Sequence, residues 1–108
     1  MMKRSVVVGT ISAFSATACF ADPPRYPVEQ YCREVADVSG GSAMIFNTCI
    51  DMEQAAYDNL KRNWNAISSQ TRSYCDEVAQ VTGGSYSILE TCIQMEEDAR
   101  SDGNTFSY

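Results

Sequence analysis

Residues 31–56 read YCREVADVSGGSAMIFNTCIDMEQAA, and residues 74–99 read YCDEVAQVTGGSYSILETCIQMEEDA. The second stretch follows the first at an offset of 43 positions, and 16 of the 26 aligned residues are identical. Each copy contains Tyr-Cys, an amphipathic run, Gly-Gly-Ser, a second amphipathic run and a second Cys. Apolar residues recur every three or four positions in these runs, which is the spacing of one helix face, and glycine commonly ends a helix. The duplication therefore predicts two helical hairpins.

The four cysteines of the two copies are expected to form two disulfides. Cys32 and Cys49 lie at equal distances from the first glycine pair, and Cys75 and Cys92 lie at equal distances from the second. Positions equidistant from the turn of an antiparallel hairpin face each other, so symmetry favours 32–49 and 75–92 among the three pairings that four cysteines allow. Helix axes ~8–10 Å apart bring facing Cα atoms within reach of a disulfide.

A zinc site is the weaker interpretation of the same cysteines. Tetrathiolate zinc sites usually contain pairs of cysteines two to four residues apart. The separations here are 17, 26 and 17 positions, and the sequence contains no His. No metal is therefore expected.

The predicted fold class is all-α, with about four helices and no segment that alternates with the period of a strand. Pro27 suits the start of the first helix, and the second helix is expected to run from a cap at Ser42 to about Trp64. Residues 22–108 are expected to form a single domain of two repeats, with a connector at 57–73 and a short polar C-terminal tail.

Residues 1–21 have the composition of a cleavable signal peptide. Lys3 and Arg4 precede an uncharged run of 13 residues, and small residues precede a cut after Ala21. The run is shorter than the ~20 apolar residues of a membrane span, so the mature chain is expected to have no transmembrane segment. A lipoprotein anchored through Cys19 is the less favoured alternative. The mature protein is expected to be periplasmic or secreted, where disulfides persist.

The charge balance argues against several classes of partner. The sequence has 8 basic and 14 acidic side chains, and loss of the signal peptide would leave six basic ones and a net charge near −8. Nucleic acids and anionic membrane surfaces attract clusters of Lys and Arg. Neither is therefore expected as a partner of this acidic chain.

Glu53 and Glu96 occupy the same position in the two copies. Reflection through each turn places Glu53 beside residue 28 and Glu96 beside residue 71, in the first turn of the partner helix. A carboxylate there meets unpaired N–H groups and the positive end of the helix dipole, which is worth ~0.3–1 kcal/mol. We expect this structural role rather than general acid or base catalysis, because no paired titratable group is fixed beside either residue.

Tyr57 and Trp64 lie seven positions apart on the second helix, outside the duplicated stretches. They are predicted to pack the two hairpins together, and a candidate partner surface is the alternative. No catalytic or cofactor-binding residue is assigned. Ser42 and Ser85 have no His to activate them, and Gly-Gly-Ser lacks the spacing and the Lys of a phosphate loop.

The chain resembles small, uncharacterised exported proteins of alphaproteobacteria. The resemblance is carried by a signal peptide, two YCxEVAxxxGGS segments and a YDNLKRNW linker, and it implies no activity. A weaker similarity connects the chain with helical lysozyme-inhibitor-like secreted proteins. It is carried by the order of Cys49, Tyr57, Leu60, Trp64, Gln70, Arg72 and Cys75. No inhibitory residue is transferred from that family.

Together these patterns predict an exported, non-enzymatic helical protein that serves as a binding or structural module of the cell envelope. Its partner would be a protein. Inhibition of a cationic enzyme such as lysozyme is the alternative, because an acidic protein is complementary to a basic one. A thiol redox enzyme is less favoured, because such enzymes use Cys-x-x-Cys and an exposed reactive thiol.

Overall fold

The computed structural model describes residues 22–108, so the predicted signal peptide at 1–21 lies outside the described residues. Four α-helices are present within this range: α1 (Val28–Asp37), α2 (Ala43–Asn63), α3 (Ser69–Gln80) and α4 (Tyr86–Asp102). A short 3-10 turn, η2 (Trp64–Ala66), follows α2. Residues 22–108 contain no strand, and the prediction of an all-α fold is confirmed.

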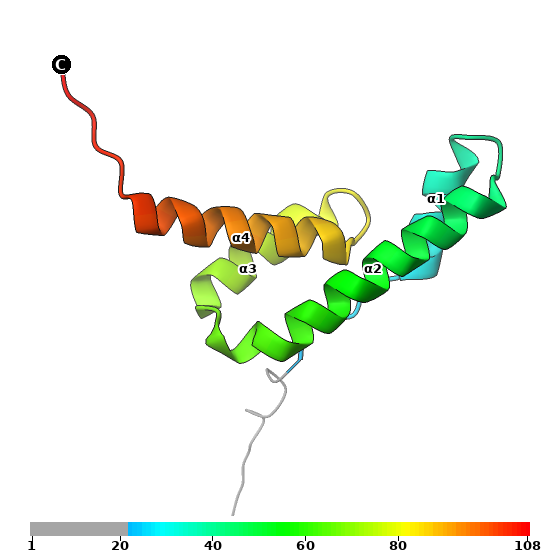
Figure 1. The fold of residues 1–108 in the computed structure, drawn as a ribbon, viewed down its shortest axis with the longest axis horizontal. Helices are drawn as coiled ribbons and strands as arrows, with labels where there is room; N and C mark the ends of the chain where they lie inside the picture. Colours follow the sequence, from blue (N-terminus) through cyan, green and yellow to red (C-terminus); the bar gives the residue numbers. More distant parts are fainter. Residues whose placement is uncertain (1–21) are drawn as a thin grey trace, which may run out of the picture.

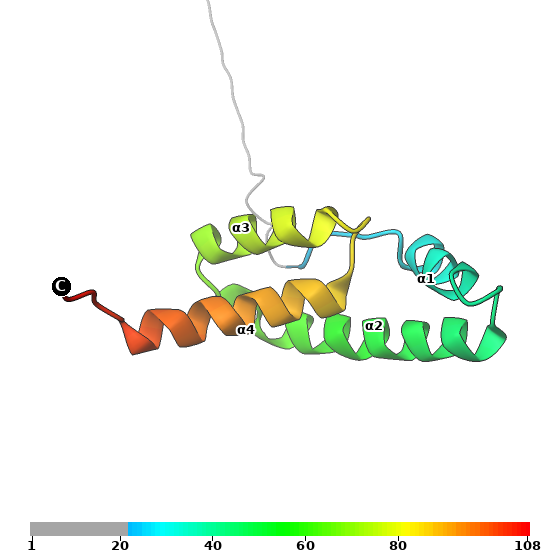
Figure 2. The same cartoon turned by 90° about the horizontal axis from the view of Figure 1, so that it is seen from above.

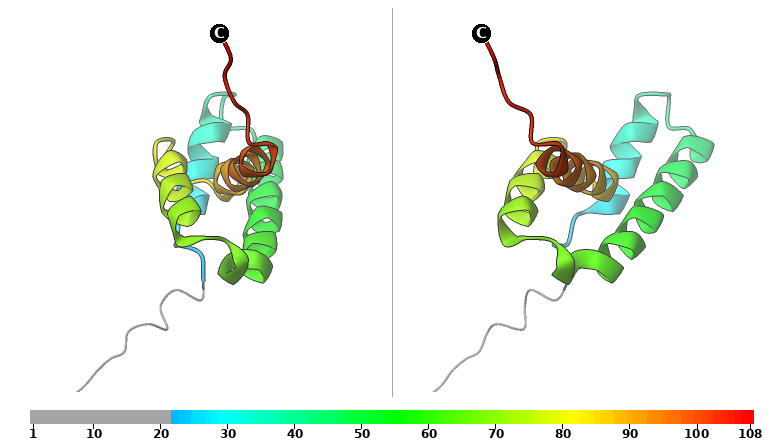
Figure 3. Two further views of the ribbon diagram at one scale, coloured as in Figure 1. Left: turned by 90° about the vertical axis from the view of Figure 1, so that its left-hand side faces the viewer. Right: turned by 60° about the vertical axis from the view of Figure 1, so that its left-hand side comes forward.

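The helices form two antiparallel hairpins, α1 with α2 and α3 with α4. α1 packs along the first half of α2, and α3 packs along α4 (Figure 1). α4 also lies against α2 (Figure 2). α1 makes no backbone contact with α3 or α4. The turned views show the two hairpins pointing in different directions (Figure 3). The second hairpin therefore covers the first only along the C-terminal half of α2.

Each hairpin turn uses its two glycines and its serine in the same way. The second glycine has a positive φ, +80° at Gly41 and +99° at Gly84, a region that residues with a side chain rarely adopt. Its N–H donates to the carbonyl of the fifth residue back, at 2.9 and 3.1 Å. Ser42 and Ser85 then accept from the N–H three residues further on, at 3.2 and 3.3 Å, and cap the next helix.

Disulfides close both hairpins with the predicted pairing. The Cα atoms of Cys32 and Cys49 are 5.6 Å apart, and those of Cys75 and Cys92 are 5.5 Å apart. Such separations are typical of disulfide-bonded residues. Each bridge closes a loop of about 17 residues, worth ~3 kcal/mol in the loop-entropy account.

The buried core is distributed unequally between the hairpins. One cluster joins the C-terminal half of α2 to α3 and α4; its members are Ala56, Leu60, Trp64, Ile67, Cys75, Ala79, Tyr86, Leu89 and Ile93. From α1, only Cys32 and Ala36 are buried. The packing of α1 on α2 therefore depends on the disulfide and on the buried side chains of Cys32 and Ala36. Several large apolar side chains of the first hairpin remain exposed to solvent.

Candidate functional site

Residues 22–27 run as an extended segment across the second hairpin, and we call this segment the N-terminal strap. The Tyr86 hydroxyl donates to the carbonyl of Pro24 at 2.6 Å and accepts from the N–H of Tyr26 at 2.9 Å. The Tyr26 hydroxyl donates to Asp76 on α3 at 2.6 Å. The Tyr26 and Tyr86 rings are in contact, with centroids 4.6 Å apart. The strap therefore connects the start of α1 to both helices of the second hairpin.

Tyr26 of the strap and Tyr86 of α4 are both held in their protonated form. Burial, reinforced by the hydrogen bond to Asp76 and by its negative charge, raises the pKa of Tyr26 well above its usual value. Burial also raises the pKa of Tyr86. Because an ionised phenol could not donate to Asp76, proton loss would break this contact.

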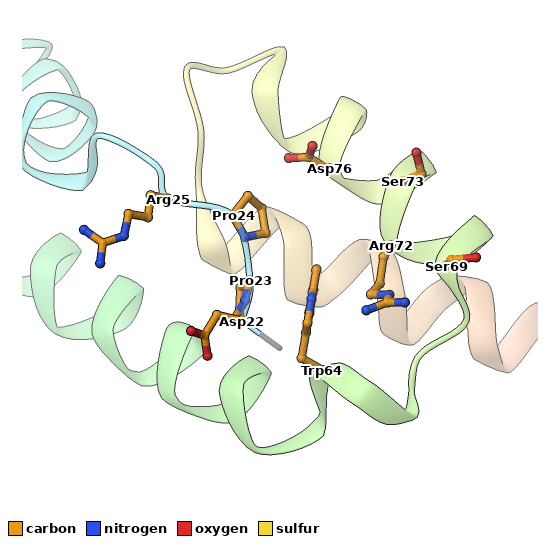
Figure 4. A pocket seen from close by; sticks show the side chains of 9 residues that line it. All are labelled: Asp22, Pro23, Pro24, Arg25, Trp64, Ser69, Arg72, Ser73 and Asp76. Carbon is orange, nitrogen blue, oxygen red and sulfur yellow. The ribbon is translucent and has the colours of Figure 1, made fainter. Parts of the chain in front are cut away.

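A pocket of about 650 Å³ lies between the strap and α3 (Figure 4). Pro23 and Trp64 are among the residues that line it, and the Arg72 guanidinium lies over the Trp64 ring at 5.5 Å from the centroid (Figure 4). Ser69 and Ser73 also line it. The sequence has no His that could activate either serine, so the pocket contains no recognisable nucleophile and base pair.

Glu53 is the main polar contact between the hairpins. Its carboxylate is 2 % exposed and accepts from the Ser85 hydroxyl and the Tyr86 N–H, both at 2.6 Å, and from the Ser87 N–H at 3.4 Å. Glu53 therefore binds the N-terminus of α4. Glu53 also lines a pocket with Val28, so it lies beside the start of α1 as predicted, but its hydrogen bonds are made with α4 and not with the first turn of α1. Symmetry within one hairpin contains no information about the helix that arrives from the other.

Glu96 has different surroundings from Glu53, although the two occupy equivalent positions in the repeat. It is half-buried and lines a small pocket with Thr71 in the first turn of α3. Arg100 lines the same pocket and donates to the Thr71 hydroxyl at 3.2 Å. The expected neighbour, residue 71, is thus present, but no third helix covers Glu96 as α4 covers Glu53.

Tyr57 and Trp64 lie where the second hairpin packs onto α2. Trp64 is 5 % exposed and belongs to the core cluster. Tyr57 is half-buried and packs against Tyr86, with ring centroids 4.8 Å apart. The structure therefore places both in the contact between the hairpins, and Trp64 is not available as a partner surface.

An apolar groove lies instead along the first hairpin, and we call it the first-hairpin groove. Its cavity measures about 360 Å³. Its walls come from α1 and α2, its floor includes the half-buried Cys49, and Ser87 at the start of α4 lies at its edge. The wall residues are Tyr31, Val35, Met44, Ile45, Thr48 and Met52.

The groove exposes large apolar side chains that the core does not use. Met44 is 74 % exposed and Met52 is 59 % exposed. Val35 on α1 is also exposed, as is Val38, which directly follows α1 and does not line the groove. Contiguous exposed apolar surface of this kind marks interaction sites more often than single scattered residues do. Sequence reasoning missed the groove because it assigned the apolar stripe of the first hairpin to the core.

The second hairpin differs from the first at one of the groove positions. Tyr31 and Met52 correspond to Tyr74 and Met95 on the second hairpin, but the position of Met44 is taken by Ser87. Ser87 lies next to the contact with α2, where its N–H donates to Glu53. The second hairpin therefore lacks one wall residue and uses the adjacent surface to pack against α2.

The remaining chemistry of the described region is limited. All four cysteines of residues 22–108 are in disulfides. Within that range no three His, Cys, Asp or Glu side chains are grouped so that they could hold a metal ion. None of the helices from α1 to α4 is long and apolar enough to cross a bilayer. Comparison with protein families, curated proteins and solved structures finds no match for this chain.

Proposed function

We propose that this chain is a non-enzymatic binding module of the cell envelope, periplasmic or secreted, whose recognition surface is the first-hairpin groove. The observation that carries the proposal is the groove itself: an apolar surface with two exposed methionines on a hairpin that has almost no core of its own. Two disulfides in a small domain are typical of an oxidising compartment, which supports the location.

The disulfide beside the groove favours a binding role. Cys49 contributes to the floor, and its bridge to Cys32 fixes the two walls relative to each other. A surface that is rigid before binding loses less conformational entropy when a partner arrives, which increases affinity. Methionine side chains add adaptability within that rigid frame, because the flexible thioether accommodates partners of different shape.

Matched substitutions in the two repeats test the proposal. Met52→Lys places a charge in the groove, whereas Met95→Lys makes the same change at the equivalent exposed position of the second hairpin. Each variant, and the unmodified protein, would be immobilised and exposed to envelope extract, and the retained proteins quantified. We expect a partner that is retained by the unmodified protein and by Met95→Lys but lost with Met52→Lys. Retention that is equal on all three would refute the groove as the recognition surface.

Inhibition of a cationic enzyme is a second candidate function, and the acidic composition favours it. The sequence has 14 acidic and 8 basic side chains, so a basic enzyme such as lysozyme would be attracted electrostatically. A lysozyme activity assay with increasing amounts of the purified protein tests this directly. Inhibition that disappears with Met52→Lys would connect this activity to the groove, and full activity at a large molar excess of the protein would eliminate the candidate.

A further inference from the structure

The charges beside the first-hairpin groove are acidic on both walls. On α1, Glu34 is exposed and lies three positions after Tyr31, on the same side of the helix. On α2, Asp51 is exposed and lies seven positions after Met44, again on the same side. The C-terminal end of α1, which carries the negative end of the helix dipole, lies at the turn beside Met44.

No basic side chain offsets these charges at the groove. Arg33 is the only Lys or Arg between residues 28 and 56. Its guanidinium lies over the Phe46 ring at 5.2 Å from the centroid, and Phe46 does not line the groove. The groove is therefore an apolar channel with an acidic rim.

The length of the groove matches two turns of a helix. Met44 and Met52 are eight positions apart on α2, which corresponds to ~12 Å along its axis. An amphipathic helix that lies in such a groove inserts side chains at i, i+3, i+4 and i+7, which span a similar length. A volume of about 360 Å³ is at the small end of the ~300–1,000 Å³ found for ligand pockets.

From these observations we infer that the first-hairpin groove binds a positively charged amphipathic helix of a partner protein. Apolar side chains of the partner occupy the channel between Tyr31, Met44 and Met52, and its Lys or Arg side chains face Glu34 and Asp51. This inference rests on the proposed binding function and adds the chemistry of the partner.

A second copy of the chain fits the groove less well. The chain is acidic overall, so two copies repel each other at the rim. Its exposed aromatic tail, with Phe106 and Tyr108, directly follows the acidic end of α4 at residues 96–102. Insertion of that tail would bring like charges together beside Glu34 and Asp51.

Methionine methyl groups provide the readout for a test. Residues 22–108 contain three methionines: Met44 and Met52 in the groove, and Met95, which is 66 % exposed, outside it. Protein with both disulfides formed and with labelled methionine methyls would be titrated in an NMR experiment. The probe is a synthetic peptide of about 16 residues with Leu at i, i+3, i+4 and i+7 and Lys on the other positions, long enough for a helix to form.

The expected result is a saturable shift of the Met44 and Met52 signals and none of the Met95 signal. The affinity should fall as salt is raised, because exposed charges are screened. Glu34→Gln combined with Asp51→Asn should weaken binding roughly three- to tenfold at low salt, while Met44→Lys should weaken it by about tenfold or more. Met95→Lys should leave the affinity unchanged.

Two control peptides make the result decisive: one with Glu in place of every Lys, and one in which the same Leu residues are spread around the helix. Equal binding of the acidic peptide overturns the charge requirement, and equal binding of the rearranged peptide overturns the groove fit. Shifts of Met44 and Met52 that depend on protein concentration without peptide would mean that a second copy occupies the groove, which also overturns the inference.

Failure of this inference is distinguishable from failure of the proposed function. If the peptide does not bind but an envelope protein is still lost specifically with Met52→Lys, the groove binds a partner of other chemistry and only the inference fails. If neither the peptide nor any envelope protein distinguishes Met52→Lys from Met95→Lys, the proposed function fails with it.

Discussion

Replacing Glu53 with Gln tests the contact that holds the two hairpins together. The buried carboxylate accepts three hydrogen bonds from the first turn of α4, two of them at 2.6 Å. Gln keeps one acceptor oxygen but removes the charge and presents an NH₂ group to a neighbouring donor. Loss of the charge at the helix N-terminus costs up to ~2 kcal/mol in a buried site, and one unsatisfied donor adds ~1–3 kcal/mol. We expect Glu53→Gln to lower the free energy of unfolding by about 2–4 kcal/mol in total, with the smaller loss if the surrounding side chains rearrange around the Gln.

Glu96→Gln is the matched control, because the residue has the same repeat position but only two helices around it. Glu96 is half-buried and lies beside Arg100 and Thr71, so its substitution should lower the free energy of unfolding by less than about 1 kcal/mol. For a domain of this size 1 kcal/mol corresponds to a Tm change of ~4–8 °C. Thermal unfolding followed by circular dichroism should therefore show a drop of at least ~8 °C for Glu53→Gln and a few degrees for Glu96→Gln.

A double-mutant cycle identifies the partner of Glu53. Ser85→Ala removes both the hydroxyl that donates to Glu53 and the cap of α4. Because the two side chains are hydrogen-bonded, the effects of Glu53→Gln and Ser85→Ala should be non-additive by ~1 kcal/mol or more in urea unfolding. Equal Tm losses for the two glutamates, or strict additivity in the cycle, would refute the assignment of Glu53 to the α4 terminus.

Three further predictions concern the strap and the disulfides. A Cβ on Gly84 would lie 3.0 Å from Tyr26 at a φ of +99°, whereas a Cβ on Gly41 would have nothing closer than 3.9 Å. Gly84→Ala should therefore lower the free energy of unfolding in urea by about 2–4 kcal/mol, and Gly41→Ala by about 1–2 kcal/mol. Equal losses would contradict a packed strap. Burial and Asp76 raise the pKa of Tyr26, so the contribution of this phenol to stability is complete below pH ~10 and is lost above it. The free energy of unfolding should therefore fall less steeply between pH 9 and ~11 in Tyr26→Phe than in the unmodified protein. Parallel curves would exclude Tyr26 as the cause. Removal of both Cys32 and Cys49 should lower the free energy of unfolding by ~3 kcal/mol. In hydrogen exchange it should abolish amide protection in α1, while α3 and α4 stay protected. Simultaneous loss of protection in all helices would show that the first hairpin folds as one unit with the second.

The local structure of this chain could be predicted because the repeat supplies a symmetric pattern. Equal distances from the glycine pairs were sufficient to pair Cys32 with Cys49 and Cys75 with Cys92, and the structure confirms both bridges. The cap at Ser42 follows from side-chain chemistry within three residues of the helix start. These features depend on neighbours in sequence or on one turn, so a single sequence contains the information.

The contacts between the repeats could not be predicted in the same way. The position of Glu53 relative to its own turn is identical to that of Glu96, yet its hydrogen bonds are to residues more than 30 positions away. The strap likewise connects Tyr26 to Asp76, 50 positions later, without any periodic signal. Which face of α2 receives α4 depends on the combined packing of both hairpins, and a one-dimensional pattern does not specify it.

The two repeats differ in what packs against them. The C-terminal half of α2 is buried because α4 packs on it through Tyr86, Leu89 and Ile93. In the first repeat no preceding helix performs that role among residues 22–108, and α1 touches only α2. Tyr86, Leu89 and Ile93 of α4 are therefore buried, whereas Met95, the counterpart of Met52, stays exposed. A bare hairpin with large exposed methionines would be expected to unfold or to associate non-specifically, but the disulfide at its centre and the acidic residues at its edges oppose both outcomes. The features that keep the first hairpin folded and separate are thus the same ones that leave its groove open to a basic partner.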